Sequence, residues 1–413
     1  MNKKSRTNRK PFLFLLSWLF YACTPAPAST PSAVLPTPKL IFPTGAPSCT
    51  TLVVAPTPGP EEPSLFPAES ADDRVRGAED PFVTITTYVD YQDNRSKFFV
   101  DVTSQLLAEY PNDLRVIYRP FPLKDIFDKS VLAMQAVEAA NVQGKFWEMN
   151  DLLYAQHEHW IKLQPADFEQ WLTAQAAGLD LDVEQFKLDF KSEATLAKVQ
   201  SFVDEGNRIG IPGTPLILIN GQIYSGPRDH GSFNDIIALI LLGKRQFTSC
   251  PPFIVQTNRQ YTATLHTEKG EVIIQLFADK APATVNSFIF LAQNGWYDDI
   301  TFHRVIPDLF AQTGDPSGTG KGNPGYYVIT EIDSKVKFSK PGMVAMVNSG
   351  PNTSGSQFFI TLAPVVEFDQ RYTIFGQVIS GMDVLAALTP RDPQPGTESP
   401  PGDKLLSVTI EEN

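Results

Sequence analysis

The chain has 413 residues, with 34 basic and 46 acidic side chains and a formal net charge of −12. This length leaves room for two domains plus a linker. The acidic balance argues against nucleic acid as a partner and leaves the surface without a basic patch for membrane binding.

The first 23 residues have the pattern of a secretory signal peptide. Five basic residues precede the apolar run 12–22, which is too short to span a bilayer as a helix. Ala22-Cys23 then resembles the cleavage site of bacterial lipoproteins, in which the cysteine becomes the lipidated first residue. This resemblance predicts a signal peptide over 1–23 and lipidation of Cys23. The protein would be tethered outside the cytoplasm to a bacterial cell membrane, or secreted if Cys23 is not lipidated.

Residues 24–79 are rich in proline, serine, threonine and alanine. Such a composition favours an extended, solvated tether over a packed core.

A second pattern begins near residue 80. The β-rich run 82–89 leads into Asp90, and the later segment 213–222, reading GTPLILINGQ, has a Thr-Pro step followed by a hairpin. These segments resemble the first strand and the cis-proline loop of DsbA-like thioredoxin-fold oxidoreductases. The helical stretches 146–153 and 166–177 fit the helical insertion of that family. The resemblance implies an α/β thioredoxin-like domain with a helical insertion over 80–246.

The redox chemistry of that family is missing. Its members place Cys-x-x-Cys directly after the first strand, where this chain has Asp93-Asn94-Arg95-Ser96. Thiol–disulfide exchange requires thiolate attack on sulfur, so we predict a redox-inactive domain. The groove beside Thr214 and Pro215 is predicted either to bind extended polypeptide by β-pairing or to have no function beyond that of a spacer.

The segment 247–258 is predicted to be a linker. Cys250 lies in it, and Cys49 and Cys250 are the only thiols that remain once Cys23 is lipidated. An isolated pair in an oxidising compartment is expected to form one disulfide.

The remaining residues, 259–413, form a β-rich pattern. Two strands, 261–265 and 270–276, are joined by a turn, and the helix 281–293 follows with Pro282 in its first turn. Further strands are predicted at 356–360, 372–378 and 405–410.

Three motifs stand within this region at fixed order: FHRVIP over 302–307, FAQTGD over 310–315, and MVNSGPNTSGSQFFI over 346–360. They resemble the substrate-pocket signature of cyclophilins, and the resemblance covers about 259–412. It implies a closed antiparallel β-barrel with two helices and peptidyl-prolyl cis-trans isomerase activity.

Rotation of an X-Pro bond crosses a barrier of about 18–20 kcal/mol and needs no nucleophile or metal. It benefits from a cation that donates to the prolyl nitrogen and from an apolar slot for the ring. By resemblance, the catalytic residues are Arg304, Gln312 and Asn348. The substrate-binding residues are Leu309, Phe310, Val347, Gln357, Phe359, Phe368 and Tyr372. Any one of these aromatic residues alone would equally fit a barrel core.

Some positions depart from the cyclophilin pattern. Glu367 stands where many members have tryptophan and Tyr372 where they have histidine, so we expect weak cyclosporin binding. Leu309 and Phe310 stand where phenylalanine and methionine are common, so the pocket keeps its volume with a changed shape.

Neither a cofactor nor a metal is predicted. The glycine-rich run 314–322 lacks phosphate-loop spacing, because five residues separate Gly314 from Gly320. His157, Glu158 and His159 are neighbours that point in different directions on a helix.

The sequence thus predicts an isomerase of X-Pro bonds in unfolded or proline-containing secreted polypeptides, assisting their folding, without nucleotide or nucleic-acid partners. The alternative is a non-catalytic, chaperone-like lipoprotein that only binds polypeptide.

Overall fold

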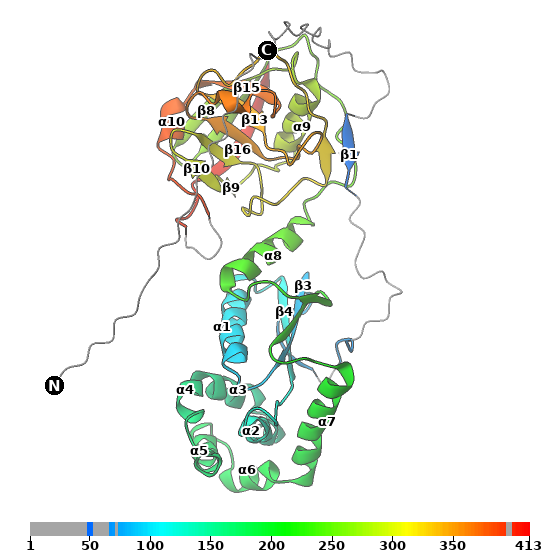
Figure 1. Cartoon of the computed structure of the whole chain (residues 1–413), viewed down its shortest axis with the longest axis vertical. Helices are drawn as coiled ribbons and strands as arrows, with labels where there is room; N and C mark the ends of the chain where they lie inside the picture. Colours follow the sequence, from blue (N-terminus) through cyan, green and yellow to red (C-terminus); the bar gives the residue numbers. More distant parts are fainter. Residues whose placement is uncertain (1–47, 53–65, 71–72, 394–398) are drawn as a thin grey trace, which may run out of the picture. The chain divides into compact units, whose positions relative to one another are not determined.

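The computed structural model of the chain describes residues 48–52, 66–70, 73–393 and 399–413 (Figure 1). The predicted signal peptide, Cys23 and most of the predicted tether lie outside these ranges. Within them, no helix combines the length and apolar character that a bilayer span requires.

The upstream domain is built on a five-stranded sheet in the order β2-β4-β3-β5-β6. β3 and β4 run parallel and are connected through α1, whereas the other neighbours are antiparallel. The strand predicted at 82–89 is confirmed as β3, whose last three residues are all buried. Around the sheet, the elements are β2 (Arg74–Gly77), β3 (Val83–Val89), α1 (Asn94–Glu109), β4 (Leu114–Pro120), β5 (Leu216–Ile219), β6 (Gln222–Tyr224) and α8 (His230–Leu242).

Between β4 and β5 the chain forms a helical insertion, seen as a lobe of helices beside the sheet in Figure 1. The predicted helical stretches 146–153 and 166–177 are confirmed within it. Proline at the start of α5 costs no hydrogen bond, because the first N–H groups of a helix have no partner. The insertion consists of α2 (Ser130–Val142), α3 (Phe146–Ala155), α4 (His157–Trp160), α5 (Pro165–Gly178), α6 (Val183–Phe190) and α7 (Glu193–Ile209).

The C-terminal domain is one antiparallel sheet of nine strands, in the order β10-β11-β14-β13-β15-β8-β7-β16-β9. It curls so strongly that its edge strands, β9 and β10, follow each other in the chain across Phe302 and His303. The edge strands β9 and β10 do not pair with each other. The sheet is therefore a strongly curled half-barrel, where the sequence predicted a closed barrel. Its strands are β7 (Tyr261–Thr267), β8 (Gly270–Leu276), β9 (Ile300–Thr301), β10 (Arg304–Ile306), β11 (Phe310–Thr313), β13 (Met343–Met346), β14 (Phe358–Thr361), β15 (Ile374–Ser380) and β16 (Lys404–Glu412).

The two predicted helices of this domain are α9 (Pro282–Gln293) and α10 (Met382–Ala386), and a 3-10 turn, η1 (Val366–Phe368), lies between β14 and β15. Ten of the twelve residues of α9 are buried. Glu331 accepts hydrogen bonds from the backbone N–H groups of Ala283 and Thr284, which satisfies the first turn of α9.

Two strands lie inside the segment predicted to be a tether. β1 (Cys49–Thr51) pairs with β12 (Tyr326–Val328) of the C-terminal domain, and β2 pairs with β4 of the upstream domain. The composition of residues 24–79 favours a solvated chain. A short run such as Arg-Val-Arg-Gly at 74–77 can nevertheless add an edge strand to an existing sheet.

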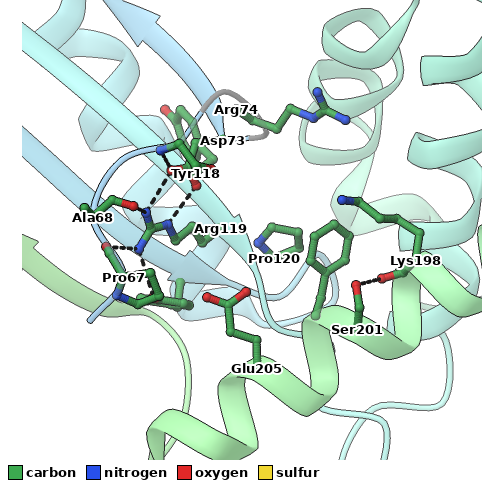
Figure 2. Close-up of a pocket in the computed structure, with 13 residues that line it drawn as sticks. Pro67, Ala68, Asp73, Arg74, Tyr118, Arg119, Pro120, Lys198, Ser201 and Glu205 are labelled. Carbon is green, nitrogen blue, oxygen red and sulfur yellow. Dashed lines mark hydrogen bonds and ion pairs between the residues drawn. The ribbon is translucent and has the colours of Figure 1, made fainter. Parts of the chain in front are cut away.

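Arg119 of β4 fixes the chain that leads into β2 (Figure 2). Its guanidinium donates to both carboxylate oxygens of Asp73 at 2.8 Å and to the carbonyl oxygens of Pro67 and Ala68 at 2.9 Å. Burial alone would raise the pKa of Asp73, but hydrogen bonds from Arg119 and Ser70 outweigh it and hold that pKa below its usual value. Pro67, Ala68 and Asp73 therefore belong to the folded domain.

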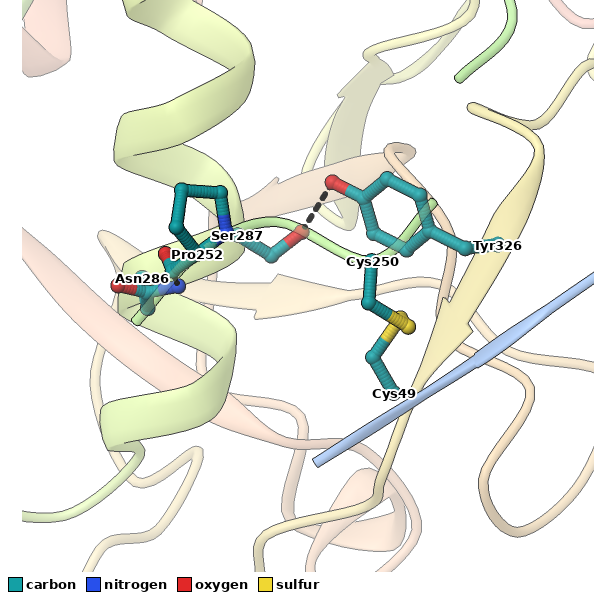
Figure 3. The surroundings of a disulfide bond; sticks show 6 residues. All are labelled: Cys49, Cys250, Pro252, Asn286, Ser287 and Tyr326. Atoms are coloured by element: carbon teal, nitrogen blue, oxygen red, sulfur yellow. Dashed lines mark hydrogen bonds between the residues drawn. A yellow bond between two sulfur atoms is a disulfide. The ribbon is translucent and has the colours of Figure 1, made fainter. Parts of the chain in front are cut away.

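The predicted linker 247–258 packs on the C-terminal domain. Asn286 of α9 accepts from the backbone of Ile254 and donates to the carbonyl of Pro252. Cys250 is disulfide-bonded to Cys49, with 5.9 Å between the two Cα atoms (Figure 3). The disulfide thus ties β1, which pairs with β12, to the segment that packs on α9.

We expect peptide mapping without reductant to yield one cross-linked pair containing Cys49 and Cys250. Reduction should separate the pair, and two freely alkylatable thiols would contradict the assignment. Replacing both residues with serine should lower the free energy of unfolding by about 2–5 kcal/mol, measured by urea denaturation.

Candidate functional site

A row of side chains crosses five strands on one face of the curled sheet. The register pairs Arg304 of β10 with Gln312 of β11, Gln312 with Phe359 of β14, Phe359 with Ala345 of β13, and Ala345 with Ile374 of β15. Directly paired residues point to the same face of a sheet. Residues that are distant in sequence therefore form one continuous surface.

The opposite face belongs to the main core. The neighbouring row, Val305-Ala311-Ile360-Val344, lies in the cluster that packs against α9. The two faces alternate because successive strand residues point in opposite directions.

A second, smaller apolar cluster covers the face that carries Arg304. It contains Leu309, Phe310, Val347, Phe359, Phe368 and Tyr372, all predicted to line the proline pocket. Phe359 is its centre: the rings of Phe368 and Tyr372 stand edge-on to it, with centroids at 5.8 and 5.2 Å. The predicted apolar residues are therefore brought together.

The base of this cluster includes residues that the sequence did not single out. Phe338 is fully buried and stacks on Phe359 at 5.8 Å, and Met343 and Val365 are buried beside it. Phe338 stands outside the three motifs, and its loop has no strand periodicity, so no local signal identified it.

Arg304 is half-buried at the rim of the cluster. Its guanidinium carbon lies 5.2 Å from the ring centroid of Phe310, and its Nε donates to Asp392 at 2.7 Å. The site therefore offers a cation beside aromatic rings, the combination from which X-Pro rotation would benefit.

Gln312 and Gln357 are joined in one network. Gln312 Nε2 donates to Gln357 Oε1 at 3.0 Å, and Gln357 Nε2 donates to the carbonyl oxygens of Gly320 and Gly322 at 3.0 and 2.9 Å. Gln357 is nearly fully buried, so the glycine-rich loop and Gln312 hold its amide in one orientation.

Asn348 follows Val347, whose backbone N–H donates to the carbonyl of Gln357. The side-chain amide of Asn348 donates to the carbonyl of Arg371 at 3.1 Å and its Oδ1 accepts from the N–H of Gly350 at 3.2 Å. Among the described residues, the backbone N–H and C=O of Asn348 have no hydrogen-bond partner. Asn348, Val347 and Gln357 line a cavity of about 250 Å³ together with the glycine-rich loop.

His303 precedes Arg304 and points into the protein. Burial lowers the pKa of His303, with the nearby Asp315 opposing this effect. The imidazole is therefore neutral at pH 7, and Arg304 is the cation at this site.

In the upstream domain, hydrogen bonds connect the positions of the missing cysteines. Asp93 caps α1 by accepting from the N–H of Arg95, and its other oxygen accepts from the hydroxyl groups of Thr214 at 2.7 Å and Ser96 at 3.3 Å. Asp93, Ser96 and Thr214 are all buried, and the peptide bond before Pro215 is cis. A polar bridge thus joins the start of α1 to the predicted cis-proline loop.

Comparison with known proteins identifies both regions. A family model described as cyclophilin type peptidyl-prolyl cis-trans isomerase/CLD matches residues 262–410, and one described as thioredoxin matches residues 69–238. Peptidyl-prolyl cis-trans isomerase-like 1 of Emericella nidulans is 47% identical over 125 residues, which cover 30% of this chain and 77% of that protein.

Peptidyl-prolyl cis-trans isomerase A of Mycobacterium tuberculosis is 45% identical over 133 residues, covering 29% of this chain and 73% of that protein. A crystal structure of a cyclophilin type isomerase from Cryptosporidium parvum aligns with 38% of this chain and 99% of its own, at 30% identity and a TM-score of 0.34.

The motifs and the matched family agree on the same stretch of sequence, and the first relative is covered over more than two thirds of its length. The chain belongs to the cyclophilin-type peptidyl-prolyl cis-trans isomerases and carries a thioredoxin-like domain upstream of its isomerase domain.

Proposed function

We propose that this isomerase acts outside the cytoplasm on X-Pro bonds of unfolded or partly folded secreted polypeptides and so assists their folding. The observation that carries the proposal is the row from Arg304 through Gln312 to Phe359, a cation, an amide and an aromatic slot on one face of the sheet. Because the family is that of an enzyme, the alternative of a purely binding lipoprotein is set aside.

In the proposed mechanism, the proline ring enters the cluster centred on Phe359, and Arg304 donates a hydrogen bond to the prolyl nitrogen. That bond strengthens as the nitrogen loses conjugation with the carbonyl, so it stabilises the transition state more than the ground state. The Gln312–Gln357 network and the free backbone groups of Asn348 hold the flanking chain while one side rotates. Fixed donors of this kind cost little reorganisation during the reaction.

We propose an extracytoplasmic location with a lipid anchor at Cys23. The basic and apolar N-terminal pattern supports it, as does the Cys49–Cys250 disulfide, because structural disulfides persist in oxidising compartments.

For the thioredoxin-like domain we favour polypeptide binding over a spacer role. Among the described residues, the backbone groups of Gly213 and Thr214 form no hydrogen bond. Those of Gly213, which is partly exposed, are thus available to pair with an extended chain, whereas Thr214 itself is buried.

Replacing Arg304 with alanine should lower kcat/KM about 10²-fold, equivalent to about 2.7 kcal/mol and in the range of a lost oxyanion-type donor, with an unchanged circular dichroism spectrum. Arg304→Lys should restore only part of the rate, since an ammonium lacks the planar fork. A protease-coupled assay measures the rate, and Arg259→Ala, which removes an exposed arginine paired with Glu412, is the control. Wild-type activity in folded Arg304→Ala would rule out this site.

The thioredoxin-like domain should not reduce insulin, because all three cysteines lie outside it. Unfolded polypeptide should shift the NMR signals of Gly213 and Thr214, whereas the Val75 amide on the edge strand β2 serves as the control. Insulin reduction would contradict the redox assignment. Unchanged signals at the loop would leave the domain a spacer.

Wild-type protein should incorporate labelled fatty acid and sediment with membranes, whereas Cys23→Ser should do neither and should keep its isomerase activity. If wild-type protein were found unlabelled in the external medium, the protein would be secreted and not lipid-anchored. Recovery in the cytoplasm would reject the proposed location.

A further inference from the structure

Among the described residues, Arg304 forms one ion pair, and its partner is Asp392. Its Oδ1 accepts from Nε of Arg304 at 2.7 Å, and both side chains are 42% exposed. The N–H groups of Nη1 and Nη2 have no partner in the described part of the chain. The carboxylate therefore binds the inner nitrogen of the guanidinium and leaves its outer fork free.

The backbone around Asp392 is fixed to β10 on both sides of Arg304. Arg391 exchanges two hydrogen bonds with Val305, at 2.6 and 2.9 Å between nitrogen and oxygen. Its side-chain Nε donates to the carbonyl of His303 at 3.2 Å, and its Nη1 donates to the carbonyl of Pro400. Asp392 is thus held at a set position relative to the strand that carries Arg304.

A half-exposed arginine otherwise samples many rotamers, and ordering it during the reaction would raise the barrier. Two contacts restrict Arg304 beforehand: the ring of Phe310 lies against its guanidinium, and Asp392 holds Nε. Together they define both the plane of the guanidinium and its rotation within that plane. The free fork then has one preferred direction.

We propose that Asp392 is a positioning residue, which orients Arg304 through Nε so that its outer N–H groups meet the prolyl nitrogen. This inference rests on the proposed role of Arg304. A carboxylate that blocked the arginine would occupy the fork itself, whereas the observed contact is at Nε alone.

The first test is Asp392→Ala in the full-length protein. We expect kcat to fall about 5- to 20-fold, the effect of losing one ordered rotamer, with KM changed less than about twofold. Exposed ion pairs contribute little to stability, so Tm should stay unchanged. Asp392→Asn, which keeps an acceptor oxygen but loses the charge, should retain more activity than Asp392→Ala.

Asp308→Asn is the matched control for Asp392→Asn. Asp308 lies in the turn between β10 and β11, is exposed, and has no side-chain partner among the described residues. The control removes the same charge close to the site, so equal losses in both variants would show a general electrostatic effect and overturn the proposal.

The decisive comparison is a double-mutant cycle. In an Arg304→Ala background, Asp392→Ala should have no further effect, and in the single variant the NMR signal of the Arg304 Nε–H should shift. Unchanged or faster catalysis by Asp392→Ala, or an equal loss in the Arg304→Ala background, would overturn the proposal. If Arg304→Ala alone keeps full activity, the role of Arg304 fails instead, so the two failures are distinguishable.

Discussion

The alternation of side chains along β14 is the constraint on which the isomerase domain depends. Phe358 faces the main core beneath α9, and the next residue, Phe359, faces the smaller apolar cluster beside Arg304, the predicted proline pocket. A shift of one residue in register would exchange the two faces along the whole strand. The core thus fixes the site, because every pocket residue on β11, β13 and β14 has a neighbour that is buried on the other side.

The thioredoxin-like domain keeps its fold without a Cys-x-x-Cys motif after the first strand. The thioredoxin match and the α/β sheet remain, while a carboxylate and two hydroxyl groups occupy the region of the missing thiols. A buried carboxylate is costly unless hydrogen bonds satisfy it. Asp93 meets this requirement through Arg95, Ser96 and Thr214. The bond from Thr214 also connects two segments that are 121 residues apart.

Much of the fold and pocket was predictable because the information is local. The strand pair at 261–276 and the helix 282–293 follow from local sequence patterns. The pocket aromatics Phe310, Phe359, Phe368 and Tyr372 were implied by the resemblance to cyclophilins, whereas Phe338 was not. The remaining features depend on partner choices between distant residues. Arg119 forms an ion pair with Asp73 at the start of the domain, and Arg304 forms one with Asp392, which lies in a proline-rich segment. Likewise, nothing in the sequence of the three-residue strand β1 predicts that it pairs with β12. Local propensity carries no information about such pairings.

The bond between Cys49 and Cys250 closes a covalent ring of chain that contains every element from β2 to α8. A single proteolytic cut anywhere in the thioredoxin-like domain opens this ring but separates nothing. The residues before Cys49 stay attached through sulfur to the isomerase domain, whatever happens to the polypeptide between them. A cut within this ring therefore releases the isomerase domain from the residues before Cys49 only if a reductant also breaks the disulfide.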